Sequence, residues 1–144
     1  MAEKRKILVV DDEDALRTVL SAELNSEGYD VATAADGTEA LAELQKSTFD
    51  LVLLDIKMPN MNGFEVLKVI KEKYTDTKVI MLTGFADLKN AIESKKLGAE
   101  DFVSKPYDLV DLLTTIDRVM SEPWTAMAKK YNLLIVDDEE YLRT

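Results

Sequence analysis

The amino-acid sequence predicts an α/β fold built on a doubly wound, five-stranded parallel sheet with helices on both faces. Short β-branched apolar runs alternate with longer amphipathic segments five times within about 120 residues. The segment Phe49–Leu54 (FDLVLL) is almost entirely apolar, which is typical of a strand buried on both faces of a parallel sheet. Crossover connections between parallel strands are right-handed, so successive helices can cover both faces.

The first two strand–helix units have clear boundaries. Ile7–Val10 is an apolar strand, and helical periodicity over 15–24 predicts a helix that Gly28 ends as a left-handed cap. Tyr29–Ala35 is typical of a second strand. The segment Asp36–Glu39 resembles a capping box, which predicts a second helix directly after it.

The remaining elements continue the same alternation after the strand at 49–54. Asn62 and Glu65 predict the start of a third helix, and Gly98 marks the end of a fourth. The other expected elements are a strand at 79–82, a helix at about 87–97, a short strand at 102–103 and a helix at 109–120.

Composition excludes several classes of function. The chain has no cysteine and no histidine, which removes thiolate chemistry, zinc–thiolate sites and the commonest general base. Its 18 basic and 28 acidic residues give a formal charge of −10, which argues against direct binding of nucleic acid. The apolar run near the start is too short for a signal peptide, and no segment is long enough to cross a membrane. We therefore expect a cytoplasmic protein without a direct nucleic-acid or membrane partner.

Polar side chains stand at the ends of four predicted strands. Asp11 and Asp12 follow the first strand, and Asp55, Thr83 and Lys105 follow the third, fourth and fifth. Ligands of open parallel sheets bind outside the carboxyl ends of the strands, where strand order reverses. We therefore expect three carboxylates, one hydroxyl and one ammonium group to meet at one edge of the sheet.

Three converging carboxylates require a cation or must take up protons. Two such charges about 4 Å apart repel by about 4 kcal/mol at an effective dielectric near 20. Oxygen ligands without histidine or cysteine favour Mg²⁺, which can also bind phosphate oxygens. Lys105 supplies a second positive charge, and a carboxylate nucleophile between two cations is suited to forming an aspartyl phosphate. The predicted edge therefore favours phosphoryl transfer.

Four segments together resemble one known family. They are ILVVDDE at 7–13, DLVLLDIKMPNMNG at 50–63, VIMLTG at 79–84 and GAEDFVSKP at 98–106. In this order and spacing they resemble the CheY-like receiver domain of two-component response regulators, over about residues 5–121. The resemblance implies the flavodoxin-like strand order 2-1-3-4-5 and a cis bond between Lys105 and Pro106.

The resemblance also implies roles for individual residues. Asp55 would be the phosphoacceptor, and Thr83 and Lys105 would contact the phosphoryl group. The metal ligands would be Asp12 directly, Asp11 mainly through water, Asp55 itself and the main-chain carbonyl of Lys57.

The family mechanism implies a signalling switch rather than a conventional enzyme. A histidine kinase or phosphotransfer protein supplies the phosphoryl group, and the receiver catalyses its own phosphorylation and slow dephosphorylation. Thr83 then moves toward the phosphate and Phe102 turns inward, although an aromatic residue at this position is also consistent with simple core packing. The face made by the fourth helix, fifth strand and fifth helix then changes, and a downstream domain or protein recognises the change.

The same face is a candidate for homodimerisation, with Asp101 and Arg118 as contacts. The side chains of Lys57 and Phe85 would overhang the phosphoryl group.

The end of the chain repeats its beginning. Residues 130–144 (KYNLLIVDDEEYLRT) match residues 4–18 (KRKILVVDDEDALRT) at nine of fifteen positions, 126 residues apart. We expect a receiver domain over 1–121, a linker over 122–130 and the truncated start of a second receiver-like repeat over 131–144. Asp137 and Asp138 correspond to the pair Asp11 and Asp12, so we expect a natural protein with tandem receivers. We also expect the apolar run LLIV to pair with an edge strand of its own or a neighbouring molecule, which is a second candidate for dimerisation.

Other functions fit the sequence less well. A magnesium-dependent phosphohydrolase would need a second acid two residues after the nucleophile, where this chain has Lys57. A flavin-binding protein of the same topology would need a phosphate-binding loop rich in Ser, Thr and Gly after the first strand. A receiver that has lost phosphorylation is disfavoured because every functional position is occupied by a competent residue.

Overall fold

The central element of the molecule is a five-stranded parallel sheet in the order β2-β1-β3-β4-β5. The computed structural model describes residues 4–84 and 88–121. Within them the strands are β1 Lys6–Val10, β2 Asp30–Ala34, β3 Leu51–Asp55, β4 Lys78–Gly84 and β5 Asp101–Lys105. The predicted fold class and strand order are therefore confirmed.

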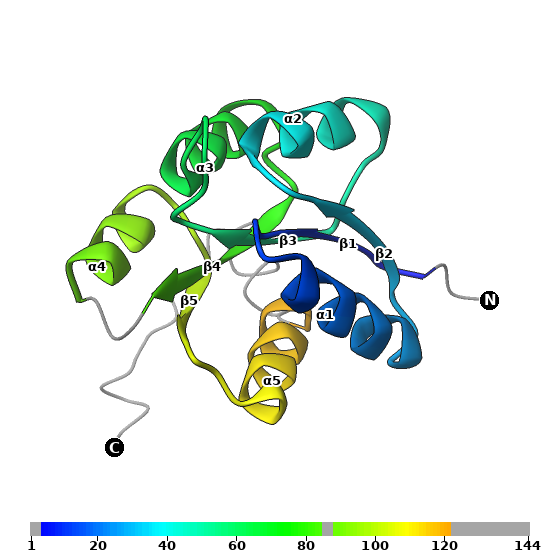
Figure 1. Cartoon of the computed structure of the whole chain (residues 1–144). Coiled ribbons are helices and arrows are strands. Elements are labelled where there is room, and N and C mark those ends of the chain that lie inside the picture. Colours follow the sequence, from blue (N-terminus) through cyan, green and yellow to red (C-terminus); the bar gives the residue numbers. More distant parts are fainter. Residues whose placement is uncertain (1–3, 85–87, 122–144) are drawn as a thin grey trace, which may run out of the picture.

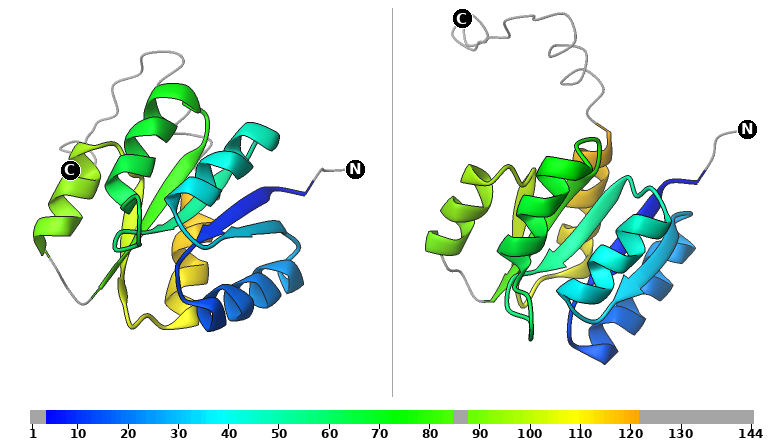
Figure 2. Two further views of the ribbon diagram at one scale, coloured as in Figure 1. Left: turned by 45° about the horizontal axis from the view of Figure 1, so that its top comes forward. Right: turned by 90° about the horizontal axis from the view of Figure 1, so that it is seen from above.

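Helices cover both faces of this sheet (Figures 1 and 2). Helices α2, α3 and α4 lie on one face, and α1 and α5 lie on the other. Their bounds are α1 Asp14–Ser26, α2 Gly37–Lys46, α3 Gly63–Lys73, α4 Leu88–Lys96 and α5 Leu109–Met120. Because α1 and α5 share one face, the acidic turn after β1 and the loop after β5 lie on the same side of the sheet.

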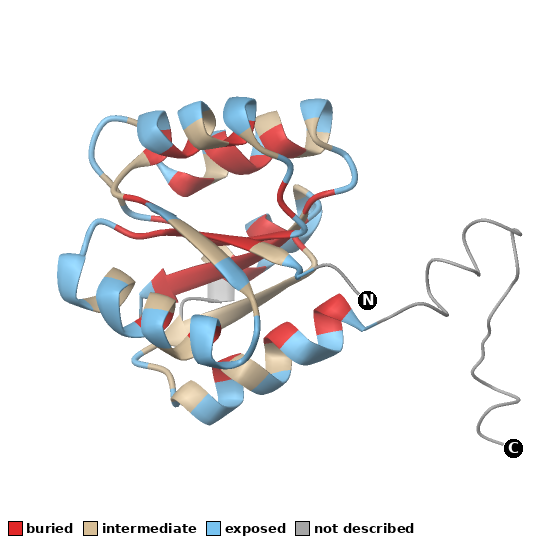
Figure 3. Ribbon diagram, turned by 90° about the vertical axis from the view of Figure 1, so that its right-hand side faces the viewer, coloured by how far each residue is buried: buried red, intermediate tan, exposed pale blue. Residues whose placement is uncertain are grey.

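The core consists of two apolar layers separated by the sheet, and Figure 3 shows the buried residues along its strands and inward helix faces. Val52 and Leu54 of β3 pack toward α2 and α3. Leu51 and Leu53 pack toward α1 and α5. All four are 0% exposed, and burial of each such side chain stabilises the fold by about 1.5–3 kcal/mol. The strand that ends in Asp55 is therefore firmly held on both faces.

The helix caps follow the local sequence signals. Asn62 and Glu65 form a complete capping box at the start of α3, as predicted. At α2, Asp36 accepts a hydrogen bond from the Glu39 amide, but the Glu39 carboxylate accepts from the Ala35 amide rather than that of Asp36. Gly28 has φ of 99°, which confirms it as the left-handed residue that follows α1.

A tight turn brings the chain back onto the end of β3. The Gly63 amide donates to the Ile56 carbonyl at 2.8 Å. A Cβ atom at Gly63 would lie only 2.3 Å from the Asp55 carbonyl oxygen, so a larger residue would push the turn away. Gly63 thus lets the loop after Asp55 close tightly against the strand.

Several predicted boundaries were wrong by a few residues. β5 extends over 101–105 rather than 102–103, because its whole length pairs with β4 from Ile80 to Gly84. β3 begins at Leu51 rather than Phe49, and Asp55, Thr83 and Lys105 lie within the last residues of their strands rather than after them. Four predictions lie outside the described residues: Phe85, the helix start at Asp87, the linker at 122–130 and the repeat at 131–144. In the described part of the chain, no helix combines the length and apolar character that crossing a membrane requires.

Candidate functional site

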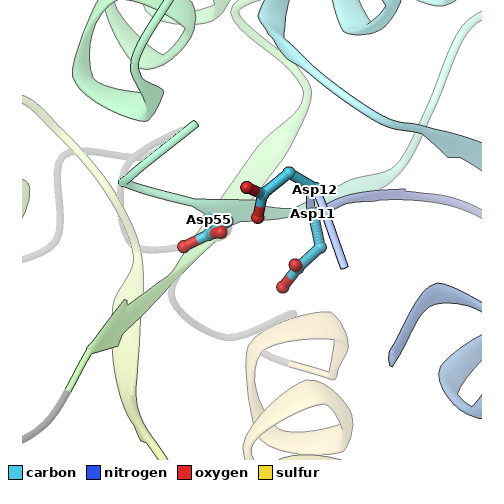
Figure 4. Close-up of side chains that lie close together, drawn as sticks. All are labelled: Asp11, Asp12 and Asp55. Carbon is cyan, nitrogen blue, oxygen red and sulfur yellow. The ribbon is translucent and has the colours of Figure 1, made fainter. Parts of the chain in front are cut away.

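Three carboxylates meet at the carboxyl edge of the sheet. Asp11 and Asp12 follow β1, and Asp55 is the last residue of the neighbouring strand β3. Each residue has a carboxylate oxygen within 4.8 Å of those of the other two (Figure 4). Asp11 and Asp55 are buried, whereas Asp12 is exposed. The predicted convergence of these residues is therefore present in the fold.

Lys105 joins the carboxylates from the end of β5. Its Nζ lies 2.8 Å from an Asp11 oxygen and 3.5 Å from an Asp55 oxygen. Glu13 lies farther away, at 3.8 Å. Burial by itself would lower the pKa of Lys105, but the hydrogen bond to Asp11 and the nearby negative charges outweigh it and raise that pKa. Lys105 therefore places a positive charge between two buried carboxylates.

Burial and neighbouring negative charges disfavour the ionised form of Asp55. Burial, followed by the negative charge of Asp11, raises the pKa of Asp55 to about 6 against the partial compensation from Lys105. The Lys105 ammonium group thus faces the cluster of Asp11, Asp12 and Asp55, and Glu13 adds a fourth carboxylate nearby. A bound cation would relieve this repulsion and favour the ionised, nucleophilic form of Asp55.

The donor set fits a hard divalent cation such as Mg²⁺. Its members are carboxylate oxygens, the ligands that such ions prefer. A cavity of about 610 Å³ opens beside them, with space for a cation and a phosphoryl group. It is lined by Asp12, Glu13, Leu16, Asp55, Lys57, Gly84, Lys105, Pro106 and Tyr107. Lys57 therefore lies at the site. Its main-chain carbonyl as a metal ligand stays a prediction.

Thr83 and Phe102 lie next to this edge on β4 and β5. Thr83 is 1% exposed and follows Leu82, the residue that pairs with Asp55 across the sheet. Phe102 pairs with Met81 and is partly buried against the apolar layer beneath α2 and α3. Thr83 thus lies on the strand beside Asp55 and Phe102 on the strand after it, and their role as a switch stays a prediction.

Two groups near the site were not anticipated. Arg17 donates from Nη1 to the Asp11 carbonyl oxygen at 2.6 Å and from Nη2 to Asp14 at 2.6 Å. Tyr107 lines the cavity, and its buried hydroxyl has no hydrogen-bond partner among the residues that the structure describes. A signal for Arg17 exists in the sequence, because Leu16-Arg17-Thr18 recurs as residues 142–144. The Lys105–Pro106 bond is cis, as the resemblance implied.

Known proteins share both this sequence pattern and this fold. The model of the family "Response regulator receiver domain" matches residues 7–117. The sporulation initiation phosphotransferase F of Bacillus subtilis is 39% identical over 115 residues, which cover 80% of this chain and 93% of that protein. The probable transcriptional regulator ycf27 of Porphyridium aerugineum is 40% identical over 118 residues, covering 82% of this chain and 49% of the relative. The chain thus spans about half the length of relatives such as ycf27.

Solved structures give the same result. The chemotaxis response regulator CheY4 of Vibrio cholerae has a TM-score of 0.77 at 40% identity, covering 81% of this chain and 99% of that one. A CheY-like receiver domain protein from Methanospirillum hungatei has a TM-score of 0.81 at 36% identity, covering 86% and 99%. From the matched family, the fold and the shared residues, the chain belongs to the response regulator receiver domain family of two-component signalling.

Proposed function

We propose that this domain is a signalling switch in which Asp55 accepts a phosphoryl group in a magnesium-dependent reaction. The observation that carries the proposal is the position of Asp55, a buried carboxylate between the Asp11–Asp12 pair and Lys105. Asp11, Asp12, Asp55 and the main-chain carbonyl of Lys57 would hold Mg²⁺. When bound, this ion would neutralise the carboxylates and the incoming phosphoryl oxygens.

The chemistry follows from the positions of the side chains. A carboxylate oxygen of Asp55 attacks the phosphorus of a phosphohistidine on a histidine kinase or phosphotransfer protein. The O–P bond forms as the P–N bond breaks, and the electron pair of the broken bond returns to the imidazole nitrogen. Lys105 and the hydroxyl of Thr83 bind oxygens of the transferred group and offset its charge. No group in this scheme turns over an external substrate, so the activity is directed at Asp55 alone.

Phosphorylation would then change the α4-β5-α5 face. Thr83 moves toward the phosphoryl oxygens, and Phe102 turns into the space that Thr83 leaves. The Arg118 guanidinium is paired with Asp101 of the same chain in this structure. A dimer that used these two residues as intermolecular contacts would have to exchange this internal pair for contacts with the partner. The downstream partner of the face is a domain or protein that recognises one of its two arrangements.

Intact-mass measurement tests this proposal. The protein is incubated with Mg²⁺ and a small phosphodonor such as acetyl phosphate or phosphoramidate, and its mass is compared with that of Asp55→Asn. We expect the mass of one phosphoryl group on the wild-type chain, none on the variant, and none when EDTA removes the metal. Phosphoryl mass that persists in Asp55→Asn would contradict the proposal.

A further inference from the structure

The acidic turn after β1 holds its two carboxylates in different ways. The Asp11 side chain is fixed through both oxygens, by the Glu13 amide at 2.9 Å and by Lys105 at 2.8 Å. Asp12 is exposed, and its carboxylate has no hydrogen-bond partner within residues 4–84 and 88–121. Figure 4 shows the two side chains leaving the backbone in different directions. The backbone therefore sets where the Asp12 side chain starts and which rotamers bring its carboxylate toward a cation.

One side chain fixes that backbone. Arg17 Nη1 donates to the Asp11 carbonyl oxygen at 2.6 Å. This oxygen belongs to the planar peptide unit that joins Asp11 to Asp12, so holding it also fixes the amide and Cα of Asp12. The preceding peptide unit, which joins Val10 to Asp11, is held separately, because the Asp11 amide donates to the Ala34 carbonyl of β2 at 3.2 Å.

Arg17 also makes a second contact, within α1. Its second nitrogen, Nη2, binds Asp14 at 2.6 Å, and its side chain is only 17% exposed. Glu13, the N-cap residue of α1, makes no side-chain capping bond, so the start of this helix lacks the usual local fixation. The planar guanidinium joins the first turns of α1 to the end of β1 through two contacts in a fixed geometry.

The terminal repeat gives independent support from the sequence. Its nine identical positions include the acidic pair and also Arg17, which recurs as Arg143 at the same distance from Asp137 and Asp138. Of the four positions between the acids and the arginine, Glu13 and Leu16 also recur, whereas Asp14 and Ala15 are replaced by Glu140 and Tyr141. The arginine thus recurs together with the acids.

We propose that Arg17 is a positioning residue that sets the direction of the Asp12 carboxylate toward the divalent cation. The inference rests on the proposed function, because Asp12 must be a metal ligand for its direction to matter. For the loss of Arg17, the inference predicts a change in Mg²⁺ affinity opposite to the change expected from charge alone. Removing a cation beside a cation site should strengthen Mg²⁺ binding by electrostatics, whereas releasing the Asp11–Asp12 peptide should weaken it.

The test measures the Mg²⁺ dissociation constant of the full chain by isothermal titration calorimetry, with the melting temperature in EDTA recorded for every variant. Arg17→Met is expected to raise the dissociation constant about fivefold, the equivalent of one ordinary hydrogen bond. Arg17→Lys keeps the charge and one donor, so it should bind Mg²⁺ more tightly than Arg17→Met. The matched control Asp14→Ala removes the other contact of Arg17 and leaves its donation to the Asp11 carbonyl in place, so it should change the constant less than twofold.

The possible outcomes separate the inference from the function on which it rests. Arg17→Met that binds Mg²⁺ as tightly as the wild type, or more tightly, overturns the inference, and so does a loss fully reproduced by Asp14→Ala. If Arg17→Met does not fold, Arg17→Ala takes its place, and wild-type affinity in that variant overturns the inference. A wild-type chain that binds no Mg²⁺, or whose affinity is unchanged in Asp12→Asn, overturns the proposed function together with the inference.

Discussion

The strands β3 and β5 contribute to the same site but are held very differently. All five residues of β3 are buried, whereas all five of β5 are only partly buried. The exposed apolar side chains of Ile92 in α4 and Val110 in α5 lie on the elements beside β5. Regions with few buried contacts open and rearrange at low free-energy cost. Asp55 is thus fixed in the rigid centre, and Lys105 and Phe102 lie in the part of the sheet that can move.

Matched valine substitutions should show the largest contrast between the two strands. Val52 of β3 is 0% exposed, and Val103 of β5 is partly buried against the α1–α5 layer. We expect Val52→Ala to lower the free energy of unfolding by about 2–3 kcal/mol, because it removes two methyl groups and leaves a cavity. Val103→Ala should cost about 1 kcal/mol or less. Equal losses in urea titration would show that the two strands are equally fixed.

Lys105 links the partly buried strand β5 to the fully buried strand β3, so its removal should have the next largest effect. Lys105→Met leaves the fully buried Asp11 carboxylate without its 2.8 Å partner. We expect a loss of about 2 kcal/mol in the free energy of unfolding without metal. The exposed Lys57 of the same cavity provides the control, and Lys57→Met should cost less than about 0.5 kcal/mol. If both variants unfold at the same urea concentration, the bridge between the strands is energetically unimportant.

Replacing Asp55 should stabilise the metal-free protein in a pH-dependent way. Burial, followed by the Asp11 charge, raises the pKa of Asp55 from 3.8 to about 6, so the folded state binds its proton more tightly than the unfolded chain. The stability that this proton provides below about pH 4 is lost as the pH rises through 6. Asp55→Asn cannot ionise, so at pH 7 in EDTA it should be more stable than the wild type by about 1–2 kcal/mol.

The same comparison at pH 4 provides the control, because the advantage of Asp55→Asn should nearly disappear there. Saturating Mg²⁺ should also reverse the order of the two stabilities at pH 7. The wild type has the Asp55 carboxylate as a ligand for the ion and the variant lacks it, so the ion stabilises the wild type more. An advantage that is the same at both pH values would show that the ionised Asp55 carboxylate is not a source of strain.

The smallest effect is expected at the surface of β5. Arg118 pairs with Asp101, but its side chain is 52% exposed. Exposed ion pairs contribute little, so Arg118→Ala should change the free energy of unfolding by less than about 0.5 kcal/mol. A chemical-denaturation difference above 1 kcal/mol would show that this pair holds the α4-β5-α5 face in one arrangement.

The sequence predicted those features of the site that depend on local pattern and on the geometry of parallel strands. The convergence of the strand-end residues could be predicted, because the carboxyl ends of parallel strands meet at one edge of a sheet. These residues are Asp11, Asp12, Asp55 and Lys105. The length of β5 could not be predicted from the sequence. Asp101, Ser104 and Lys105 are extended because they pair with β4, and not because these residue types favour strands.

Contacts between side chains far apart in the sequence could not be predicted from local pattern either. Glu100 accepts hydrogen bonds from Lys71 of α3 and from the Val79 amide of β4, and no spacing in the sequence indicates either contact. The contact of Arg17 with the Asp11 carbonyl is nearer in sequence, but a helical arginine is more often a solvent-facing residue. Its significance follows from the three-dimensional position of the peptide that it holds.

The central claim is that the rigid strand β3 presents the phosphoacceptor, and mapping the modified residue tests it most directly. After reaction with Mg²⁺ and a phosphodonor, borohydride reduces an aspartyl phosphate to a stable homoserine, which peptide mass spectrometry can locate. The account predicts a single modified position, Asp55. Modification at Asp11 or Asp12 with Asp55 intact would contradict it.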